Sequence, residues 1–387
     1  MKSDNYGIKE VISIFRHQLN NKHLTSRQKK VMSHLSQCHT PALGGRLKAC
    51  DNCGHAKVMW YSCRNSHCPA CNHNKREKWV LNRKQDLLPV GYFHVVFTLP
   101  DDLNALCLQY PKELYNLLFR SAWETMQTFG HTHKHLGAKT GMIAVLHTWG
   151  QNISLHPHLH CLVPGGGLSP QGKWKKARSK GKYLYPVKAL SKMFRGKFTD
   201  GLIKLQKSGK INMQTPFDAD QKHLHPLYRR PWVVYAVKPT TGPKHVVEYL
   251  GRYVNRVAIA NSRIKKADDQ KVVFSWKDYR TDKKADMTLD GKVFLKRWLM
   301  HVLPEGFVKV RHYGILSCHH KKKALAAARA FFKVNPPENT KDLKWHEIFE
   351  RLHGHSPFQC PECSEGVMMV VEVYKPIRDG PAGEVAA

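Results

Sequence analysis

Paired cysteines constrain this 387-residue chain more than any other feature of its sequence. Six of the eleven cysteines fall between Cys38 and Cys71. Two pairs have the Cys-x2-Cys spacing of a metal knuckle, Cys50/Cys53 and Cys68/Cys71, and 14 residues separate them. Two facing knuckles supply four thiolates, the ligand set of a tetrahedral structural zinc site. The sequence therefore predicts one zinc ion held by these four cysteines.

Further cysteines and histidines leave other metal arrangements open. A packing role is the simpler interpretation for the neighbouring side chains, but they could replace one ligand or build a second site: Cys38, Cys63, His55, His67 and His73. Near the C-terminus, Cys360-x2-Cys363 forms half of another site. Two unliganded structural cysteines are the alternative, and the candidates to complete that site are Cys318, His319, His320, His353 and His355.

The charge balance points to a polyanionic partner. The chain has 63 Lys and Arg against 29 Asp and Glu, a formal net charge of +34 with His neutral. Nucleic acid is the first candidate for such a surface, and a generic basic surface is the alternative. No run approaches the roughly 18 apolar residues of a membrane span, and the first residues lack the apolar region of a secretion signal. We therefore expect no membrane partner and a cytoplasmic location.

Strand-like and helix-like segments alternate irregularly, which predicts an α+β fold. Runs rich in β-branched and aromatic residues predict strands at 92–99, 142–149, 158–163, 232–238, 271–276 and 307–313. Apolar periodicity predicts helices at 101–137, 187–208, 246–258 and 291–303. Three consecutive parts are expected: a helical and zinc-binding domain at 1–90, an α+β domain at 91–315, and a helical extension with a loose tail at 316–387.

Alternating histidines on one predicted strand indicate a second kind of metal site. His158 and His160 flank Leu159, so on a strand both imidazoles would project from one face. His156 shares this parity, but Pro157 makes its place in the strand less certain. Gln151, seven residues before His158, could return to the same ion through a hairpin.

Two tyrosines at helical spacing could act beside this metal site. Tyr249 and Tyr253 are four residues apart, and Arg252 and Arg256 each follow a tyrosine by three. Core packing is the usual reason for such a pair. Beside a metal site, however, a tyrosine can attack a phosphodiester that a divalent ion polarises.

A basic loop follows the histidine strand and predicts contact with DNA phosphates. Six bases occur within ten residues: Lys173, Lys175, Lys176, Arg178, Lys180 and Lys182. The stretch from Gly167 to Lys173 has the glycine spacing of a phosphate-binding loop, but Trp174 stands where that motif needs Ser or Thr. We therefore reject nucleotide binding there and expect a DNA-tracking loop.

Taken in order, these motifs resemble those of a known family. They are Cys50-x2-Cys53, Ser62-Cys63-Arg64-x3-Cys68-Pro69-x-Cys71, the strand from Tyr92 to Pro100, the stretch from His156 to Gly167, and Tyr249-x3-Tyr253. Over roughly residues 10 to 315 the chain resembles the two-tyrosine HUH transposases of rolling-circle insertion sequences, the IS-ninety-one type. The resemblance implies an antiparallel HUH-nuclease sheet that carries the histidine pair, with the tyrosines on a facing helix.

The resemblance also implies roles for individual residues. His158 and His160 would hold a catalytic Mg²⁺ or Mn²⁺, with Gln151 as the third ligand. Tyr249 and Tyr253 would be the nucleophiles. The family often has His where this chain has Asn255, so that position departs from the pattern.

The implied activity is nicking and joining of single-stranded DNA at element ends through 5′-phosphotyrosine intermediates. The expected partners are hairpins and strands at the ends, target DNA, and a host helicase and replication machinery in the bacterial nucleoid, because no helicase motif is present. A relaxase or replication initiator with the same chemistry is one alternative. A non-catalytic zinc-ribbon DNA-binding protein is another.

Overall fold

The computed structural model describes most of the chain and divides it into two compact units. The described residues are 6–177, 184–213, 225–237, 251, 253–254, 256–278, 281–337 and 343–377, with the backbone alone at 72–76 and 352. Unit 1 gathers Met1–Lys78, Ile259–Val302 and Asn339–Ala387, and unit 2 gathers Trp79–Ala258 and Leu303–Glu338. The units are thus interleaved along the chain, unlike the three consecutive parts expected from sequence.

Unit 2 is built on a five-stranded sheet in the order β12-β4-β5-β3-β8, and every neighbouring pair is antiparallel. Its strands are β3 (Tyr92–Thr98), β4 (Gly141–Trp149), β5 (Leu155–Pro164), β8 (Val234–Val237) and β12 (Val310–Gly314). A separate hairpin joins β6 (Gly166–Leu168) to β7 (Trp174–Lys176). The antiparallel sheet with helices confirms the α+β class.

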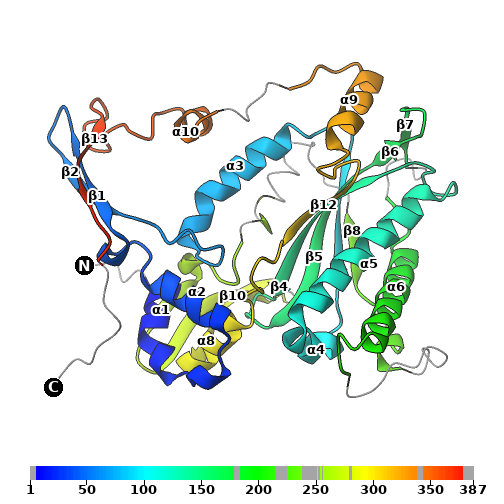
Figure 1. Cartoon of the computed structure of the whole chain (residues 1–387), viewed down its shortest axis with the longest axis horizontal. Coiled ribbons are helices and arrows are strands. Elements are labelled where there is room, and N and C mark those ends of the chain that lie inside the picture. Colours follow the sequence, from blue (N-terminus) through cyan, green and yellow to red (C-terminus); the bar gives the residue numbers. More distant parts are fainter. Residues whose placement is uncertain are drawn as a thin grey trace. The chain divides into compact units, whose positions relative to one another are not determined.

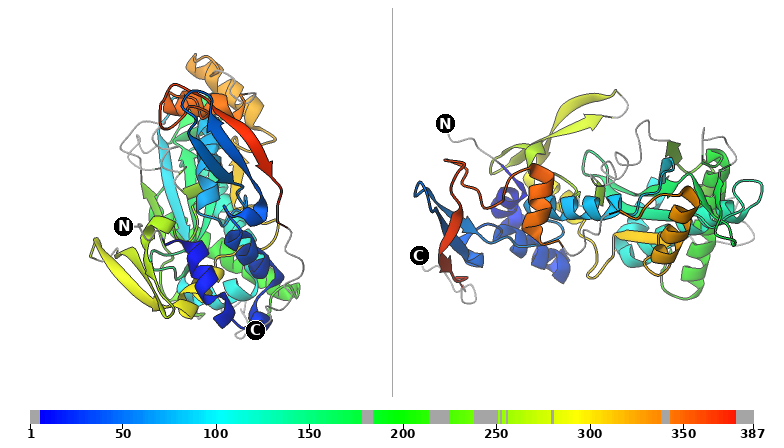
Figure 2. Two further views of the ribbon diagram at one scale, coloured as in Figure 1. Left: turned by 90° about the vertical axis from the view of Figure 1, so that its left-hand side faces the viewer. Right: turned by 90° about the horizontal axis from the view of Figure 1, so that it is seen from above.

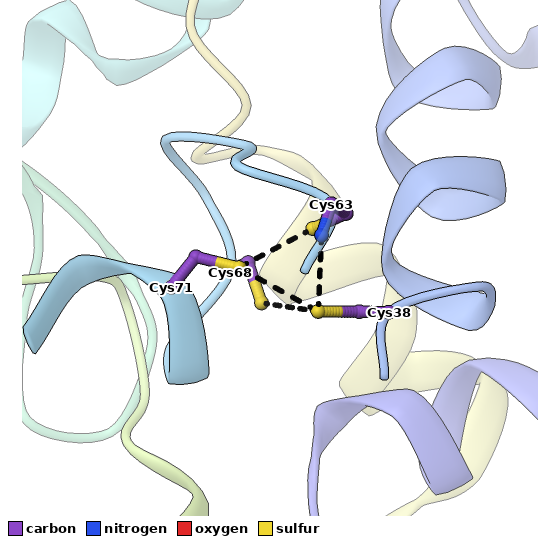
Figure 3. A group of neighbouring side chains, drawn as sticks. All are labelled: Cys38, Cys63, Cys68 and Cys71. Carbon is purple, nitrogen blue, oxygen red and sulfur yellow. Dashed lines mark hydrogen bonds between the residues drawn. The ribbon is translucent and has the colours of Figure 1, made fainter. Parts of the chain in front are cut away.

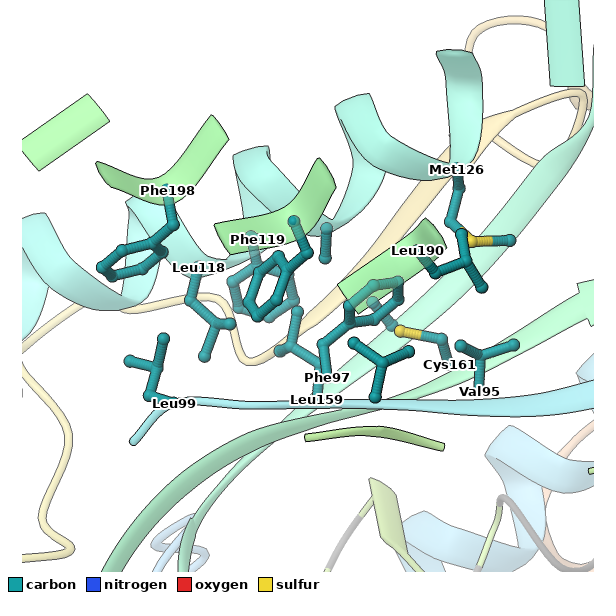
Figure 4. Close-up of a cluster of buried hydrophobic side chains, with 14 of the residues drawn as sticks. Val95, Phe97, Leu99, Leu118, Phe119, Met126, Leu159, Cys161, Leu190 and Phe198 are labelled. Carbon is teal, nitrogen blue, oxygen red and sulfur yellow. The ribbon is translucent and has the colours of Figure 1, made fainter. Parts of the chain in front are cut away.

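One face of this sheet is covered by α5 (Pro111–His131) and α6 (Val187–Lys207), with the short α4 (Asn104–Gln109) beside them (Figure 1). Alternate residues of β3, among them Val95 and Phe97, enter the core on this side, as do Leu159 and Cys161 of β5 (Figure 4). The ring of Phe97 meets that of Phe194 on α6 at 5.0 Å. This packing holds the central strands in place.

The opposite parity of β4 and β5 faces a second apolar cluster. Val145 and Leu162 pack there with Leu325 and Ala328 of α9 (Lys321–Phe332). His160 shares this parity, because it lies two residues before Leu162. An ion pair between Lys321 and Asp86, at 3.0 Å, joins the start of α9 to the segment after α3 (His73–Lys84). Apolar side chains therefore cover the face of the sheet that carries His160, next to that histidine. We call this side the histidine face.

In unit 1, two helices pack beside the small sheet β11-β10-β9, and a third helix, α2, packs against α1. These elements are α1 (Ile8–Phe15), α2 (Ser26–Ser36), α8 (Gly291–Leu299), β9 (Ile264–Ala267), β10 (Lys271–Asp278) and β11 (Lys283–Asp290). Thr25 and Gln28 cap α2 reciprocally, each side chain accepting from the other's backbone N–H. Gly291 lets α8 approach α1 closely, since a Cβ there would lie 1.9 Å from the ring of Phe15.

A second sheet of unit 1 joins the two ends of the sequence in the order β13-β1-β2 (Figures 1 and 2). Its strands are β1 (Gly45–Cys50), β2 (Ala56–Trp60) and β13 (Met368–Tyr374), and α10 (Trp345–His353) precedes β13. We expected a helical extension at 316–387, but β13 pairs antiparallel with β1 along its whole length. The C-terminal segment therefore completes a sheet that the N-terminal hairpin begins.

None of the helices in the described ranges is both long and apolar enough to cross a membrane.

Candidate active site

Three histidines meet on one face of the unit 2 sheet. In the register of β4 and β5, His147 lies opposite His158 and Val145 lies opposite His160. Directly opposite residues of antiparallel strands share a face, and so do residues two apart on one strand. The ligand nitrogens of His147, His158 and His160 accordingly lie within 4.8 Å of one another. The predicted pair is therefore brought together, and His147, which the sequence did not single out, joins it.

Hydrogen bonds aim these imidazoles at a common point. Nδ1 of His158 lies 2.6 Å from the carbonyl oxygen of His156, which can only accept, so Nε2 of His158 keeps its lone pair. That Nε2 lies 3.1 Å from Nε2 of His160. Nδ1 of His160 lies 2.9 Å from Nε2 of His94 on β3. A cation between the two Nε2 atoms is compatible with this arrangement when His160 donates its Nδ1–H to His94.

Burial keeps these rings in the form that binds metal. It lowers the pKa of His158 and of His94 to about 4, and it moves the pKa of His147 and of His160 in the same direction. The rings are therefore neutral near pH 7, as metal ligands must be. Three neutral imidazoles suit a first-row transition-metal ion, whereas Mg²⁺ prefers oxygen ligands.

Tyr253 stands directly against the three-histidine cluster. Its ring stacks on His160, with centroids 3.9 Å apart and planes 29° apart. Its backbone carbonyl accepts from Nε2 of His147 at 2.8 Å, which leaves Nδ1 of His147 as the ligand atom. Gly251 is helical, like Tyr253, and a Cβ there would lie 2.3 Å from Cγ2 of Val80, so glycine permits the close packing. The predicted partner tyrosine, Tyr249, lies outside the described residues, as do Arg252 and Asn255.

Gln151 lies in the turn between β4 and β5 and is partly buried. His147, and not Gln151, is the third residue of the cluster. A role for Gln151 as a ligand stays a prediction.

Two cations lie near this site, Arg256, which was expected, and Lys309, which was not. Arg256 is exposed, and its carbonyl accepts from Nζ of Lys309 at 3.4 Å. Burial is the main cause of the lowered pKa of His147, and the charges of Lys309 and Arg256 add to it. Both cations therefore lie near His147.

The predicted basic loop is the β6–β7 hairpin and its turn. Lys173 lies in the turn, Lys175 and Lys176 are on β7, and all three are exposed. The glycine-rich stretch forms a strand and a hairpin turn, and no helix follows it as a phosphate-binding loop requires. Arg178 lies outside the described residues.

His94 can be tested as a positioning residue. Replacing it by Phe keeps the ring shape but removes the hydrogen-bond acceptor for His160. Partners of this kind typically contribute 10- to 100-fold to metal affinity. We expect the His94→Phe variant to bind Mn²⁺ about 10- to 100-fold more weakly by isothermal titration. His312 on β12, which is outside the cluster, gives the matched control His312→Phe, and equal losses in both variants would exclude a specific role.

The cysteines form two sites where one was expected. Cys68 and Cys71 gather with Cys38 and Cys63 (Figure 3), and Cys50 and Cys53 belong to a different cluster of unit 1. In the first cluster, Sγ of Cys38 lies 3.5 Å from that of Cys71 and 3.7 Å from that of Cys68. The prediction that both knuckles face each other is therefore wrong, and Cys38 and Cys63 are potential ligands instead of packing residues.

The second cluster joins distant parts of the chain. Cys50 and Cys53 meet Cys360 and Cys363, with both cross-pair Sγ–Sγ distances at 3.7 Å. Pairing of β1 with β13 brings the knuckles together, because Cys50 ends β1 opposite Met368. Backbone N–H groups donate to sulfur on both sides, from Asn52 to Cys50 and from Gly366 to Cys363. Cys318 and the histidines proposed to complete the C-terminal pair are not in this cluster.

In the first cluster, ionisation of one thiol makes ionisation of its neighbours less favourable. Hydrogen bonds from Cys63 and Cys68 lower the pKa of Cys38 to about 2, and the same sulfur raises the pKa of Cys63 to about 12. All four thiols of this cluster can be ionised together only when a cation lies between them. Both four-cysteine clusters fit a structural zinc ion.

The four-cysteine clusters are those of a protein with a zinc-binding domain. Residues 141–324 match a family model described as "Putative transposase", and residues 8–99 match one described as "Transposase zinc-binding domain". The chain belongs to the transposase family of IS-ninety-one-type insertion sequences.

Two curated relatives show the same affiliation. The chain is 41% identical to "Putative transposase y4qJ" of Sinorhizobium fredii (strain NBRC 101917 / NGR234), over 96% of this chain and 97% of that protein. It is 27% identical to "Transposase for insertion sequence element IS801" of Pseudomonas savastanoi pv. phaseolicola, over 88% of this chain and 82% of that protein. No solved structure matches the chain.

Proposed function

We propose that this transposase nicks and joins single-stranded DNA at the ends of its element through 5′-phosphotyrosine intermediates. The observation that carries this proposal is the stacking of Tyr253 on His160 of the three-histidine cluster. A metal site and a nucleophile side chain in contact are what metal-assisted phosphodiester cleavage requires.

The chain's own groups supply the positions for this chemistry. The phenolic oxygen of Tyr253 forms a bond to phosphorus and loses its proton, while the bond from phosphorus to the 3′ oxygen breaks and that oxygen gains a proton. His147, His158 and His160 would hold a divalent ion, which when bound withdraws negative charge from the scissile phosphate. The all-imidazole donor set favours Mn²⁺ over Mg²⁺. Tyr249 would act as the second nucleophile, and Arg256 and Lys309 would hold the incoming strand.

The proposed partners follow from this chemistry. Nicking leaves a 3′-OH that a host polymerase can extend, and a host helicase would unwind the strand. The enzyme would therefore work at chromosomal DNA in the bacterial cytoplasm. The relatives named above favour a transposase over a plasmid relaxase or replication initiator.

Nicking of a labelled single-stranded oligonucleotide tests the proposal. The wild-type protein with Mn²⁺ should cleave a strand that carries the element end, and chelation of the ion should stop cleavage. His147→Ala and His158→Ala should each lower the rate by more than about 100-fold, beyond the usual effect of a residue that only orients a metal ligand. Both variants should still bind the strand.

Controls separate a catalytic role from a binding role. His156→Ala changes a neighbouring histidine that is outside the cluster and should cleave like wild type. Unchanged cleavage in the His147 and His158 variants would remove the metal site from the mechanism. Binding without any cleavage by the wild-type protein would favour a non-catalytic DNA-binding protein.

A further inference from the structure

A cavity of about 630 Å³ lies in unit 2 and is separate from the histidine cluster. It is bounded by the segment after α5, the β6–β7 hairpin and the start of α9. Its apolar lining includes Ala138, Leu168, Ile315 and Ala324. Pockets of this size accommodate small organic ligands, and an apolar floor suits a flat ring.

The charged groups that line this cavity are all basic. Lys139, Lys175 and Lys323 line it together with His131, His133 and His320, and no carboxylate is among its lining residues. Within the described ranges, none of the three lysines forms an ion pair with a carboxylate. The charge of Lys139 is the main cause of the lowered pKa of His320, so these two groups lie near each other at the cavity. A cavity lined by both apolar and cationic side chains fits a nucleotide, whose base would contact the apolar residues and whose phosphate would lie at the lysines.

The walls of the cavity are held in place by backbone pairing. Lys139 and Leu168 exchange hydrogen bonds of 2.9 and 3.0 Å, which fix the hairpin to the strand leading into β4. Nζ of Lys175 donates to the carbonyl of Gly137 at 3.2 Å, so this cation is directed to the cavity wall. Leu168 and Ile315 belong to the apolar cluster that contains Val145 and Leu162 on the histidine face of the sheet.

The strand β4 connects the cavity to the histidine cluster. Lys139 lies eight residues before His147, which corresponds to roughly 26 Å at the rise of a strand. One DNA strand has a phosphate about every 3.4 Å in B form, so this distance spans about eight nucleotides, and fewer in an extended strand. A strand held at the histidines therefore reaches the cavity when it extends for that many nucleotides.

We propose that this cavity binds one nucleotide of the DNA strand whose scissile phosphate lies at the three-histidine cluster. The inference rests on the proposed function only for the position of the scissile phosphate at the histidine cluster. Binding of a nucleotide in the cavity does not depend on that function. The site anchors the strand at a fixed distance from the nick and so contributes to where the enzyme cuts.

Charge reversal on one turn of α9 tests this site in the full-length protein. Lys323 lines the cavity, whereas its exposed neighbour Lys322 does not, so Lys323→Glu and Lys322→Glu change the net charge equally. Fluorescence anisotropy should show weaker binding of a 20-nucleotide strand by Lys323→Glu than by Lys322→Glu. The triple variant Lys139→Ala, Lys175→Ala, Lys323→Ala should lower the slope of log K against log salt by about 0.7, because the one nucleotide held in the cavity contributes one neutralised phosphate.

Strand length and free nucleotides separate the possible outcomes. Shortening the strand on either side of the nick should remove the difference between the two Glu variants once the anchored side is too short to cross the distance of roughly 26 Å between Lys139 and His147. Deoxynucleoside monophosphate should compete for the site better than inorganic phosphate. Equal binding by Lys323→Glu and Lys322→Glu at every length would overturn the inference.

The cavity and the proposed chemistry can fail independently. His158→Ala should lose cleavage yet keep the difference between the two Glu variants. If the wild-type protein does not nick DNA but that difference persists, the nucleotide site stands and the proposed function fails. If nicking occurs and the difference is absent, the cavity has no such role.

Discussion

Replacing Tyr253 and Tyr249 together by Phe should abolish every covalent adduct between this transposase and single-stranded DNA. The ring of Tyr253 stacks on His160, and Phe retains that contact while it removes only the hydroxyl. Loss of a structural tyrosine hydroxyl costs about 1 kcal/mol of stability and would not affect chemistry. Loss of the nucleophilic oxygen, by contrast, leaves no atom that can form the bond to phosphorus.

Single variants and a control locate the effect. Each single Tyr→Phe variant should stay folded, and at least one should still form the adduct with a 3′-labelled strand in a denaturing gel. Tyr235→Phe changes an exposed tyrosine on β8 and should behave as wild type. An adduct in the double variant would mean that the nucleophile lies elsewhere. If Tyr249→Phe has no effect in cleavage or in transposition, the enzyme uses Tyr253 alone.

The histidine site could be predicted only in part, because sequence spacing reports neighbours on one strand and not between strands. His158 and His160 are two residues apart, so strand parity was enough to place them together. His147 joins them through the register of β4 on β5, which shifts at an irregularity between His147 and Trp149. One residue of slip would have moved His147 to the other face. The same holds for His94, which reaches His160 from β3.

The cysteines show the opposite limit, where nearness in sequence was misleading. Cys50 and Cys68 are close along the chain, yet the knuckle of Cys50 meets residues about 310 positions away. That contact depends on the pairing of β1 with β13, and the Val-rich strand from Met368 to Tyr374 does not reveal its partner. The match to the zinc-binding family model, residues 8–99, also ends long before Cys360.

The two-cluster arrangement predicts two zinc ions for each chain, held independently. Cys63→Ser should remove one ion, Cys363→Ser should remove the other, and the double variant should retain none by elemental analysis of the purified protein. Structural zinc contributes about 10–16 kcal/mol of apparent binding free energy in small zinc fingers. Since whole domains are stable by only about 5–15 kcal/mol, each loss should unfold the local structure around its cluster.

A single shared site would give a different pattern. With one ion at Cys50, Cys53, Cys68 and Cys71, the variants Cys53→Ser and Cys68→Ser would lose the same ion, and Cys363→Ser would lose none. In the two-cluster arrangement, Cys53→Ser and Cys363→Ser should instead lose the same ion, because Cys53 and Cys363 belong to the one cluster that joins β1 to β13. Cys318→Ser, at an exposed cysteine outside both clusters, should keep two ions.

Limited proteolysis should then release the C-terminal segment from Cys53→Ser and Cys363→Ser but not from Cys63→Ser, because only the first two lose the metal bridge that supports β13. Full zinc content in Cys363→Ser would show that the C-terminal pair holds no ion.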